Sequence, residues 1–305
     1  MNLISLKDLA KKDILRLLDK AADIKKDPDK YSGLMKGKSM LMIFQKPSLR
    51  TRVSFEVAMT QLGGHAIYSD SDSMPLGSKE TISDTAKVAS RFCDIIIARL
   101  FEHAELEELG KYSDVPVINA LTNRSHPCQI LADLLTIKEK KKTTGIKVAY
   151  LGDSNNNITH SLIYAAAILG FELSIACPVE HSPQPGILKV AKELAKKTGA
   201  KIEVVHNAEK AVKNADVVYT DSWMSYHIPR EDMADRVKIF KPFQVTTYLM
   251  RKAKKNALFM NCLPAMRGYE QTAEVIDGKQ SIVFDQAENR LHMQKAIILF
   301  LMGKS

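Results

Sequence analysis

Short apolar runs alternate with amphipathic runs along almost the whole chain, and this alternation limits the fold more than any other feature of the sequence. The apolar runs have the length of buried β-strands, at residues 40–44, 65–68, 94–99, 115–119, 148–151, 173–176, 202–205, 216–220 and 258–261. Helices are predicted at residues 5–25, 51–62, 81–91, 102–109, 126–140, 157–169, 187–197, within 230–255, and at 285–302. Strands that alternate with helices indicate parallel sheets covered by helices on both faces, so the predicted fold class is α/β.

A chain of 305 residues is long for one hydrophobic core, so we expect two domains. The helix that begins at His126-Pro127, with the lysine-rich residues after it, is the predicted passage between them. We place the first domain at residues 1–133, the second at residues 134–290, and a C-terminal helix that packs back on the first domain at residues 291–305. Each domain is expected to be a parallel sheet flanked by helices.

The net charge of +9, from 44 basic and 35 acidic residues, fits either a polyanionic partner or a small anionic substrate. The lysine clusters at residues 138–142 and 252–255 are typical of solvated helix ends. The sequence has no zinc-finger spacing, no aromatic RNA-binding signature and no long basic arm, so we do not expect nucleic-acid binding.

The four cysteines, Cys93, Cys128, Cys177 and Cys262, form no C-x-x-C pair, which indicates neither a zinc site nor a redox dithiol. Sparse cysteines suit a reducing cytosol. The N-terminus lacks the apolar core of a signal peptide, and no apolar run approaches membrane-spanning length. We therefore expect a cytoplasmic protein without a membrane partner.

The segment at residues 45–52, QKPSLRTR, carries the strongest local signal of function. It lies where the strand at 40–44 ends and a helix starts, so free backbone N–H groups and the positive end of the helix dipole face outward. Its two arginines and two hydroxyl groups add to that geometry and favour a phosphate site. An ordinary capped helix with exposed arginines is the alternative interpretation.

This segment resembles the S-T-R-T-R signature of the aspartate and ornithine carbamoyltransferase family. Three further family motifs follow in the family's order: His126-Pro127-Cys128-Gln129, Asp221-Ser222-Trp223-Met224-Ser225 and Cys262-Leu263-Pro264. The last two are most similar to those of ornithine carbamoyltransferases. The resemblance implies a carbamoyltransferase that moves the carbamoyl group of carbamoyl phosphate to the δ-amine of L-ornithine, giving L-citrulline and phosphate. It also implies an active site in the cleft between the two domains.

By this resemblance the first domain binds carbamoyl phosphate and the second binds ornithine. The expected carbamoyl phosphate-binding residues are Ser48, Leu49, Arg50, Thr51, Lys79, Arg99, His126, Gln129, Cys262, Leu263 and Arg290, with Leu49 contributing only its backbone. The expected catalytic residues among them are Arg50, Arg99, His126 and Cys262. The expected ornithine-binding residues are Asn157, Asp221, Ser225 and Tyr226.

Several of these residues also have an ordinary structural interpretation. The alternatives are a helix cap for His126, a solvated loop residue for Lys79, an Asx turn for Asp221, a small core residue for Cys262, and a surface arginine paired with Glu288 for Arg290.

The expected reaction is direct attack of the δ-amine on the carbamoyl carbon. Arg50, Thr51, Arg99 and His126 are expected to stabilise the tetrahedral oxyanion. We expect no metal and no organic cofactor, because the leaving group is already activated. Substrate binding should favour domain closure, with residues 222–236 as the moving segment. The resemblance further implies a homotrimer or a multiple of trimers, in which Lys79 reaches a neighbouring subunit, and a place in arginine biosynthesis or the urea cycle.

Four positions depart from the family pattern. Leu49 replaces a threonine of the first motif, and Pro75 stands near the position of a glutamine that contacts carbamoyl phosphate in many ornithine enzymes. Tyr226 replaces a methionine, and Asn261 replaces a histidine before the C-L-P motif. The changes at Tyr226 and Asn261 leave open another amine acceptor, such as putrescine or a modified ornithine, or a catalytically silent relative.

The turn at residues 152–157, GDSNNN, follows a strand and precedes a helix, as dinucleotide-binding turns do. It lacks the second and third glycines that let a pyrophosphate approach the backbone. We therefore do not expect a nicotinamide cofactor, and the resemblance assigns this turn to the amino-acid substrate.

Overall fold

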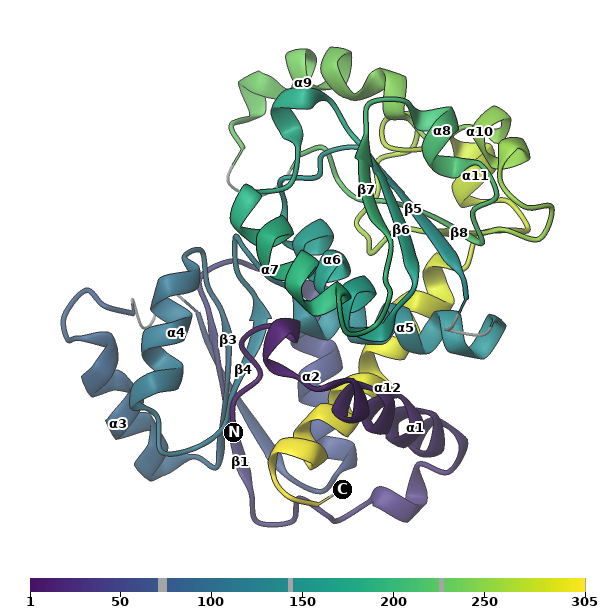
Figure 1. Cartoon of the computed structure of the whole chain (residues 1–305). Coiled ribbons are helices and arrows are strands. Elements are labelled where there is room, and N and C mark those ends of the chain that lie inside the picture. The colour runs from purple at the N-terminus through teal and green to yellow at the C-terminus, as the bar shows by residue number, and fades with distance from the viewer. Residues whose placement is uncertain (71–75, 142–144, 225–227, 305) are drawn as a thin grey trace. The chain divides into compact units, whose positions relative to one another are not determined.

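The computed structural model describes residues 1–70, 76–141, 145–224 and 228–304, and its helices and strands follow the alternating order predicted from the sequence (Figure 1). The chain divides into two compact units, residues 1–135 with 288–305, and residues 136–287. Two helices run across this division, α5 (Pro127–Lys140) and α12 (Val283–Leu301). The expected domain ends at residues 133 and 290 lie close to it.

The first unit is built on a parallel sheet with strand order β2-β1-β3-β4. Its strands are β1 (Ser39–Phe44), β2 (His65–Asp70), β3 (Ile95–Arg99) and β4 (Val117–Leu121). Its helices are α1 (Lys11–Lys26), α2 (Leu49–Gln61), α3 (Ile82–Phe92) and α4 (His103–Tyr112), with the adjoining parts of α5 and α12. Helices α3 and α4 cover one face of the sheet, and α1, α2 and α12 cover the other (Figure 1). Because both faces are covered, the central strand β3 is a continuous buried run rather than an alternating one.

The predicted start of the first helix is wrong. Ser5 caps only a short 3₁₀ turn, Leu6–Asp8, and α1 begins at Lys11. The N-terminal segment is instead held by tertiary pairing, because the N–H of Leu3 donates to the carbonyl of Val117 in β4 at 2.9 Å. A long-range contact of this kind overrides the local helical pattern.

The second unit is built on a parallel sheet with strand order β7-β6-β5-β8-β9. Its strands are β5 (Lys147–Leu151), β6 (Glu172–Ala176), β7 (Ile202–Val205), β8 (Val217–Thr220) and β9 (Leu258–Met260). Its helices are α6 (Asn157–Leu169), α7 (Pro185–Ala195), α8 (Ala208–Val212), α9 (Met233–Phe240), α10 (Thr247–Lys252) and α11 (Ala273–Ile276). Helices α8 and α11 were not predicted, because one turn of helix is too short to show a helical period.

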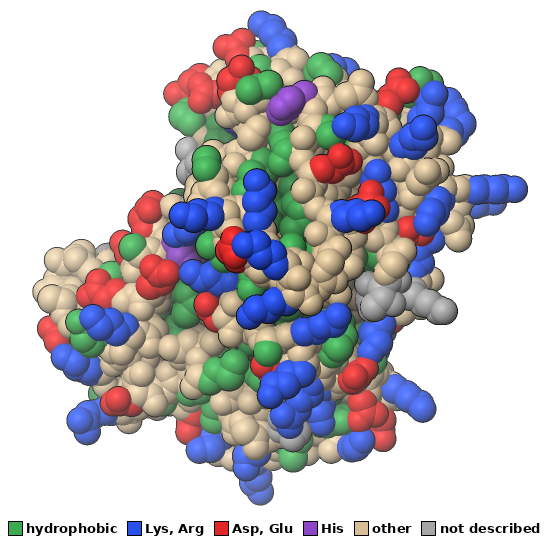
Figure 2. All heavy atoms as spheres, in the orientation of Figure 1, with side chains coloured by type: hydrophobic (Ala, Val, Ile, Leu, Met, Phe, Trp, Pro, Cys, Tyr) green, Lys and Arg blue, Asp and Glu red, His purple; other side chains and the backbone are tan. Residues whose placement is uncertain are grey.

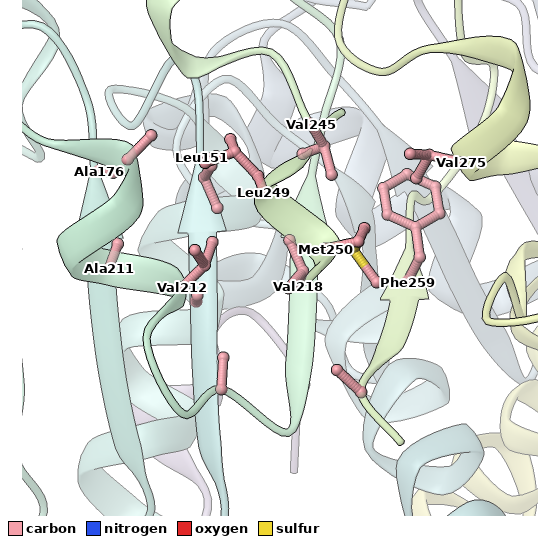
Figure 3. Close-up of a cluster of buried hydrophobic side chains, with 14 of the residues drawn as sticks. Leu151, Ala176, Ala211, Val212, Val218, Val245, Leu249, Met250, Phe259 and Val275 are labelled. Atoms are coloured by element: carbon pink, nitrogen blue, oxygen red, sulfur yellow. The ribbon is translucent and has the colours of Figure 1, made fainter. Parts of the chain in front are cut away.

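A hydrophobic core lies between this second sheet and the short helices α8, α10 and α11 (Figure 3). Leu151, Val218 and Phe259 reach it from three adjacent strands, and Val212 and Met250 reach it from the helices. All five side chains are at most 5% exposed. This packing fixes where β5, β8 and β9 end, and therefore where the polar residues after them begin.

In each unit the strand order reverses beside the first strand. Strand β1 has β2 on one side and β3 on the other, and β5 has β6 on one side and β8 on the other. At such a point the loops after the neighbouring strands diverge and leave a crevice at the carboxyl edge of the sheet. The residues after β1 and β3, and those after β5 and β8, are therefore the places to look for binding groups.

Candidate active site

The carboxyl end of β1 leads directly into the N-terminus of α2. Ser48 is the N-cap residue, and its Oγ accepts the N–H of Thr51 at 3.3 Å. Its hydroxyl also donates to Thr51 Oγ1 at 3.0 Å. Leu49 and Arg50 occupy the first helical turn, where backbone N–H groups have no carbonyl partner within the helix. The turn thus offers N–H groups and the positive end of a helix dipole to an anion.

Arg290 of α12 lies beside this turn. Its Nη1 donates to Gln129 Oε1 at 2.5 Å, and its Nη2 donates to Thr51 Oγ1 at 3.3 Å. Arg290, Gln129 and Thr51 are each at most 3% exposed. The alternative of a surface arginine paired with Glu288 is therefore wrong. Because Thr51 Oγ1 accepts from both Ser48 and Arg290, its own proton is directed to a further acceptor such as a ligand oxygen.

Arg99 and Lys46 bring more positive charge to the same edge of the sheet, where His126 also lies. Arg99 is the last residue of β3 and pairs in register with Phe44 of β1. His126 directly precedes α5, and Lys46 follows β1. All three side chains are 4% exposed. A bound dianion would stabilise the buried cations Arg99 and Lys46, since each is otherwise poorly solvated.

This surrounding charge changes how the buried groups titrate. Burial, and then the positive charges of Arg290, Arg99 and Lys46, hold the pKa of His126 well below its ordinary value. His126 is therefore a neutral imidazole at neutral pH. Burial and the charge of Arg99 lower the pKa of Lys46 to about 8, against a smaller opposing effect of Glu102.

Lys46 had no role in the sequence prediction. Its ammonium lies 4.3 Å from the centre of the Phe101 ring, in a position where the charge is held over an aromatic face. The sequence feature that could have identified Lys46 as a site residue is its position between the end of β1 and the helix cap Ser48. Its burial beside Arg99 depends on the pairing of β1 with β3, which the sequence pattern does not give.

Two other predicted residues of the first unit are exposed. The side chain of Leu49 is 75% exposed, so this departure from the family's threonine costs no core packing. Lys79 is also exposed and lies shortly before α3. The structure does not bring either side chain into the buried cluster of cations.

In the second unit, Asp221 and Cys262 are brought together. They follow the adjacent strands β8 and β9, and Cys262 Sγ donates to Asp221 Oδ1 at 3.0 Å. Burial raises the pKa of Asp221 above its ordinary value, although hydrogen bonds from Cys262 and from the Ser222 backbone oppose this rise. A carboxylate and a thiol side by side make a site for an amine or ammonium group.

The turn after β5 is shaped by packing as well as by polar contacts. Gly152 has a φ of +122°, and a Cβ at this position would lie 3.1 Å from Trp223 Nε1. Asn156 caps α6 by accepting the N–H of Thr159 at 2.8 Å, and Asn157 is the half-buried first residue of that helix. The single glycine of this turn therefore makes room for Trp223.

Asn261, which stands where the family has a histidine, supports the turn that carries Cys262. Its side chain is fully buried, its Oδ1 accepts the N–H of Leu263 at 2.8 Å, and its Nδ2 donates to Gln271 Oε1 at 3.1 Å. These bonds fix the backbone immediately after β9. The change at Asn261 therefore keeps the geometry of the turn without a titratable side chain.

Some predicted residues cannot be placed in this geometry. Ser225 and Tyr226 lie outside the described residues, as does Pro75. Among the residues that are described, no group of three or more His, Cys, Asp or Glu side chains is arranged to hold a metal ion. No helix in this part of the chain is both long and apolar enough to cross a membrane.

Comparison with known proteins gives matches over the whole chain. The carbamoyl-P binding domain of aspartate/ornithine carbamoyltransferases matches residues 1–139, and the Asp/Orn binding domain matches residues 144–301. An anabolic ornithine carbamoyltransferase of Pyrococcus furiosus is 48% identical over 99% of this chain and 96% of its own length. An ornithine carbamoyltransferase of Methanococcus aeolicus is 46% identical over 100% of both chains.

Solved structures agree with these sequence matches. The P. furiosus ornithine carbamoyltransferase structure has a TM-score of 0.95 at 48% identity and covers 100% of this chain and 97% of its own. The anabolic ornithine carbamoyltransferase of Campylobacter jejuni has a TM-score of 0.94 at 40% identity and covers 100% of this chain and 99% of its own.

Proposed function

This chain belongs to the aspartate/ornithine carbamoyltransferase family, and from that membership we propose that it transfers the carbamoyl group of carbamoyl phosphate to the δ-amine of L-ornithine. The products are L-citrulline and phosphate. The observation that carries the choice of acceptor is the pairing of Asp221 with Cys262. A carboxylate at this place attracts the ammonium side chain of ornithine, whereas it would repel the side-chain carboxylate of aspartate. Relatives that are 46–48% identical and bear the ornithine name support this choice.

Carbamoyl phosphate is assigned to the cationic edge of the first unit. The N-terminal turn of α2 provides backbone N–H groups and the hydroxyl of Thr51, and Arg50 and Arg290 provide charge for the phosphate oxygens. Arg99 and Lys46 add two further buried cations at the same edge. The prediction that Ser48 binds phosphate directly is kept here, together with its role as the cap of α2.

His126 is assigned to the carbamoyl carbonyl. Because its pKa lies well below the ordinary value, it acts as a neutral N–H donor and not as a cation. Gln129 lies one helical turn further on, where its Oε1 already accepts from Arg290 and retains a lone pair for the carbamoyl amide. Together with Arg50, Thr51 and Arg99, His126 stabilises the negative charge that develops on the carbonyl oxygen.

The acceptor amine is held by Asp221 and Cys262, with Asn157, Ser225 and Tyr226 assigned to the α-amino and α-carboxylate ends. The δ-ammonium first loses a proton to water, because only the neutral amine has a lone pair for attack. The amine then forms a C–N bond to the carbamoyl carbon, and the C–O bond to phosphate breaks with its electron pair on phosphate. The second amine proton passes to the departing phosphate, which balances the reaction without a cofactor.

The remaining expectations from the sequence are part of this proposal. They include residues Cys262 and Leu263 near carbamoyl phosphate, and a homotrimer or multiple of trimers in which Lys79 reaches a neighbouring subunit. Arginine biosynthesis is supported by the anabolic name of two relatives, and a cytoplasmic location is supported by four cysteines that form no disulfide. The predicted movement of residues 222–236 includes residues outside the described part of the chain.

The excess of positive charge suits a small anionic substrate. On the face shown in Figure 2, lysine and arginine side chains are interspersed with aspartate and glutamate side chains and with uncharged surface. The buried cations Lys46, Arg99 and Arg290 are instead gathered at one sheet edge of the first unit. Mixed charge on this face, together with these three buried cations at one sheet edge, fits recognition of a small dianion better than recognition of a polyanion.

An amine-acceptor panel tests the proposal. Purified protein with carbamoyl phosphate is given ornithine, putrescine, lysine or aspartate, and phosphate release and the carbamoylated product are measured without added metal. We expect citrulline from ornithine and little product from the other amines. Faster turnover of putrescine or aspartate would overturn the choice of ornithine. If none of the four amines leads to phosphate release, a catalytically silent relative that only binds substrate is favoured.

A further inference from the structure

The second unit contains two charged residues, the buried Glu270 and the partly buried Arg236, that touch no predicted substrate group and hold the same short stretch of backbone. Glu270 is fully buried, and its Oε1 accepts the N–H of Trp223 at 3.2 Å. Arg236 of α9 donates from Nε to the carbonyl of Trp223 at 2.5 Å. The backbone of Trp223 is therefore fixed on both sides by charge-assisted hydrogen bonds, which are stronger than neutral ones.

Each of these residues also ties Trp223 to a second segment that carries a proposed acceptor residue. The other carboxylate oxygen of Glu270, Oε2, accepts the N–H of Met266 at 2.9 Å, four residues after Cys262. Arg236 Nη2 donates to Asp153 Oδ2 at 2.5 Å, in the turn that leads to Asn157. The segments after β5, β8 and β9 are thus joined through the side chains of Glu270 and Arg236.

The indole ring of Trp223 anchors the same stretch through apolar contacts. It is 1% exposed and stacks on Phe240, with ring centroids 5.8 Å apart and an interplanar angle of 29°. The guanidinium of Arg236 also lies over Phe240, 4.9 Å from the centre of that ring. Trp223 is only two residues after Asp221, so any shift of its backbone moves the carboxylate relative to Cys262.

We propose that Glu270 and Arg236 are positioning residues for the amine acceptor: they fix the backbone of Trp223 so that the carboxylate of Asp221 meets the thiol of Cys262. This inference rests on the proposed function only for the identity of the acceptor. The contact between Asp221 and Cys262 at 3.0 Å is the geometric outcome that the two residues secure. Removing the Glu270 carboxylate from water is costly, and its two backbone N–H donors, from Trp223 and Met266, offset that cost.

Glu270→Gln tests the proposal with little change of shape. An amide offers one oxygen acceptor and one NH₂ donor, so it satisfies only one of the two backbone N–H groups and opposes the other. We expect the KM for ornithine to rise about tenfold or more, because a buried N–H is left without an acceptor. The KM for carbamoyl phosphate should stay within about twofold, because its proposed ligands in the first unit are not touched.

Asp216→Asn is the matched control. Asp216 is 8% exposed, accepts the backbone N–H of Lys147 at 3.0 Å, and pairs with Lys254 at 2.8 Å. It precedes β8, at the opposite end of the strand from Asp221. Loss of this carboxylate should lower stability while the KM for ornithine stays at the wild-type value. Equal KM changes in the two variants would mean that Glu270 acts only through stability and would overturn the proposal.

The thiol of Cys262 gives a second measurement that needs no turnover. Cys93, Cys128 and Cys177 are buried, whereas Cys262 is partly exposed, so alkylation by iodoacetamide reports on Cys262. In Glu270→Gln the loss of the contact with Asp221 should speed alkylation about threefold or more, with no change in Asp216→Asn. A wild-type alkylation rate in Glu270→Gln would overturn the positioning role. If Glu270→Gln is alkylated faster but the wild type forms no citrulline, the positioning role is supported and the proposed function is rejected.

Discussion

Lys46→Met should make the protein more stable and less able to bind carbamoyl phosphate. The substitution removes a buried ammonium and keeps an unbranched side chain of similar length. The pKa of Lys46 is lowered from 10.5 to about 8, which corresponds to about 3 kcal/mol of destabilisation of the charged form. Because the ammonium keeps some contact with water and its position over the Phe101 ring is stabilising, we expect a net gain of about 1–2 kcal/mol.

The pH dependence of this gain has a defined sign. Since the pKa is lower in the folded chain than in the unfolded chain, the ammonium destabilises the fold fully below pH 8. This destabilisation fades as the pH rises from about 8 toward 10.5, because the folded protein then releases the proton. The stability difference between Lys46→Met and the wild type should therefore be largest near pH 7 and smaller at pH 9.

Urea unfolding at pH 7 and pH 9 measures the stability difference, and the KM for carbamoyl phosphate measures the functional loss. We expect that KM to rise about tenfold or more, as for the loss of a hydrogen bond or ion contact to a charged group. Lys87→Met, at an exposed lysine of α3, is the control and should change neither quantity appreciably. A variant that is less stable at pH 7 and binds carbamoyl phosphate normally would show that Lys46 is a structural residue.

Three further changes test other parts of the site. Arg290→Met removes the contacts to Gln129 and Thr51 and should raise the KM for carbamoyl phosphate about tenfold to a hundredfold in steady-state assays. Leu49→Thr adds a hydroxyl at an exposed position of the first helical turn and should lower the same KM about twofold to tenfold; no change would mean that the backbone alone serves there. Because the pKa of Asp221 is raised, the wild-type carboxylate should become protonated at a higher pH than an ordinary one, and the KM for ornithine should rise as the pH falls. Asp221→Asn should raise this KM at neutral pH and remove its dependence on low pH. An unchanged acid limb in the variant would assign that limb to another group.

The central strands could be predicted because both sheets are covered on two faces and strands such as β3, β5 and β8 are nearly continuous buried apolar runs. The edge strands β2 and β7 are only partly buried. The short helices α8 and α11 and the true start of α1 could not be predicted, since a single turn shows no period and the pairing of Leu3 with β4 is a long-range contact. Errors of this kind come from tertiary structure, which a local pattern does not contain.

The site residues divide in a similar way. The anion-binding N-terminal turn of α2 at residues 48–51 could be predicted from the preceding strand, the helix cap and the charges alone. The position of Arg290 in the site could be predicted only from the family resemblance. The burial of Lys46 and Glu270 could not be predicted, because a charged residue in a loop is usually solvated. The structure also explains Asn261, whose two hydrogen bonds support the turn that carries Cys262.

Citrulline formation by Arg50→Ala and Arg52→Ala shows whether the N-terminal turn of α2 binds carbamoyl phosphate for transfer to ornithine. The two arginines share one segment, but Arg52 is exposed and pairs with Glu56 at 2.9 Å. We expect Arg50→Ala to lose about a hundredfold or more of kcat/KM for carbamoyl phosphate, while Arg52→Ala stays near the wild type. Equal rates in the two variants, or a wild type that forms no citrulline, would contradict this expectation.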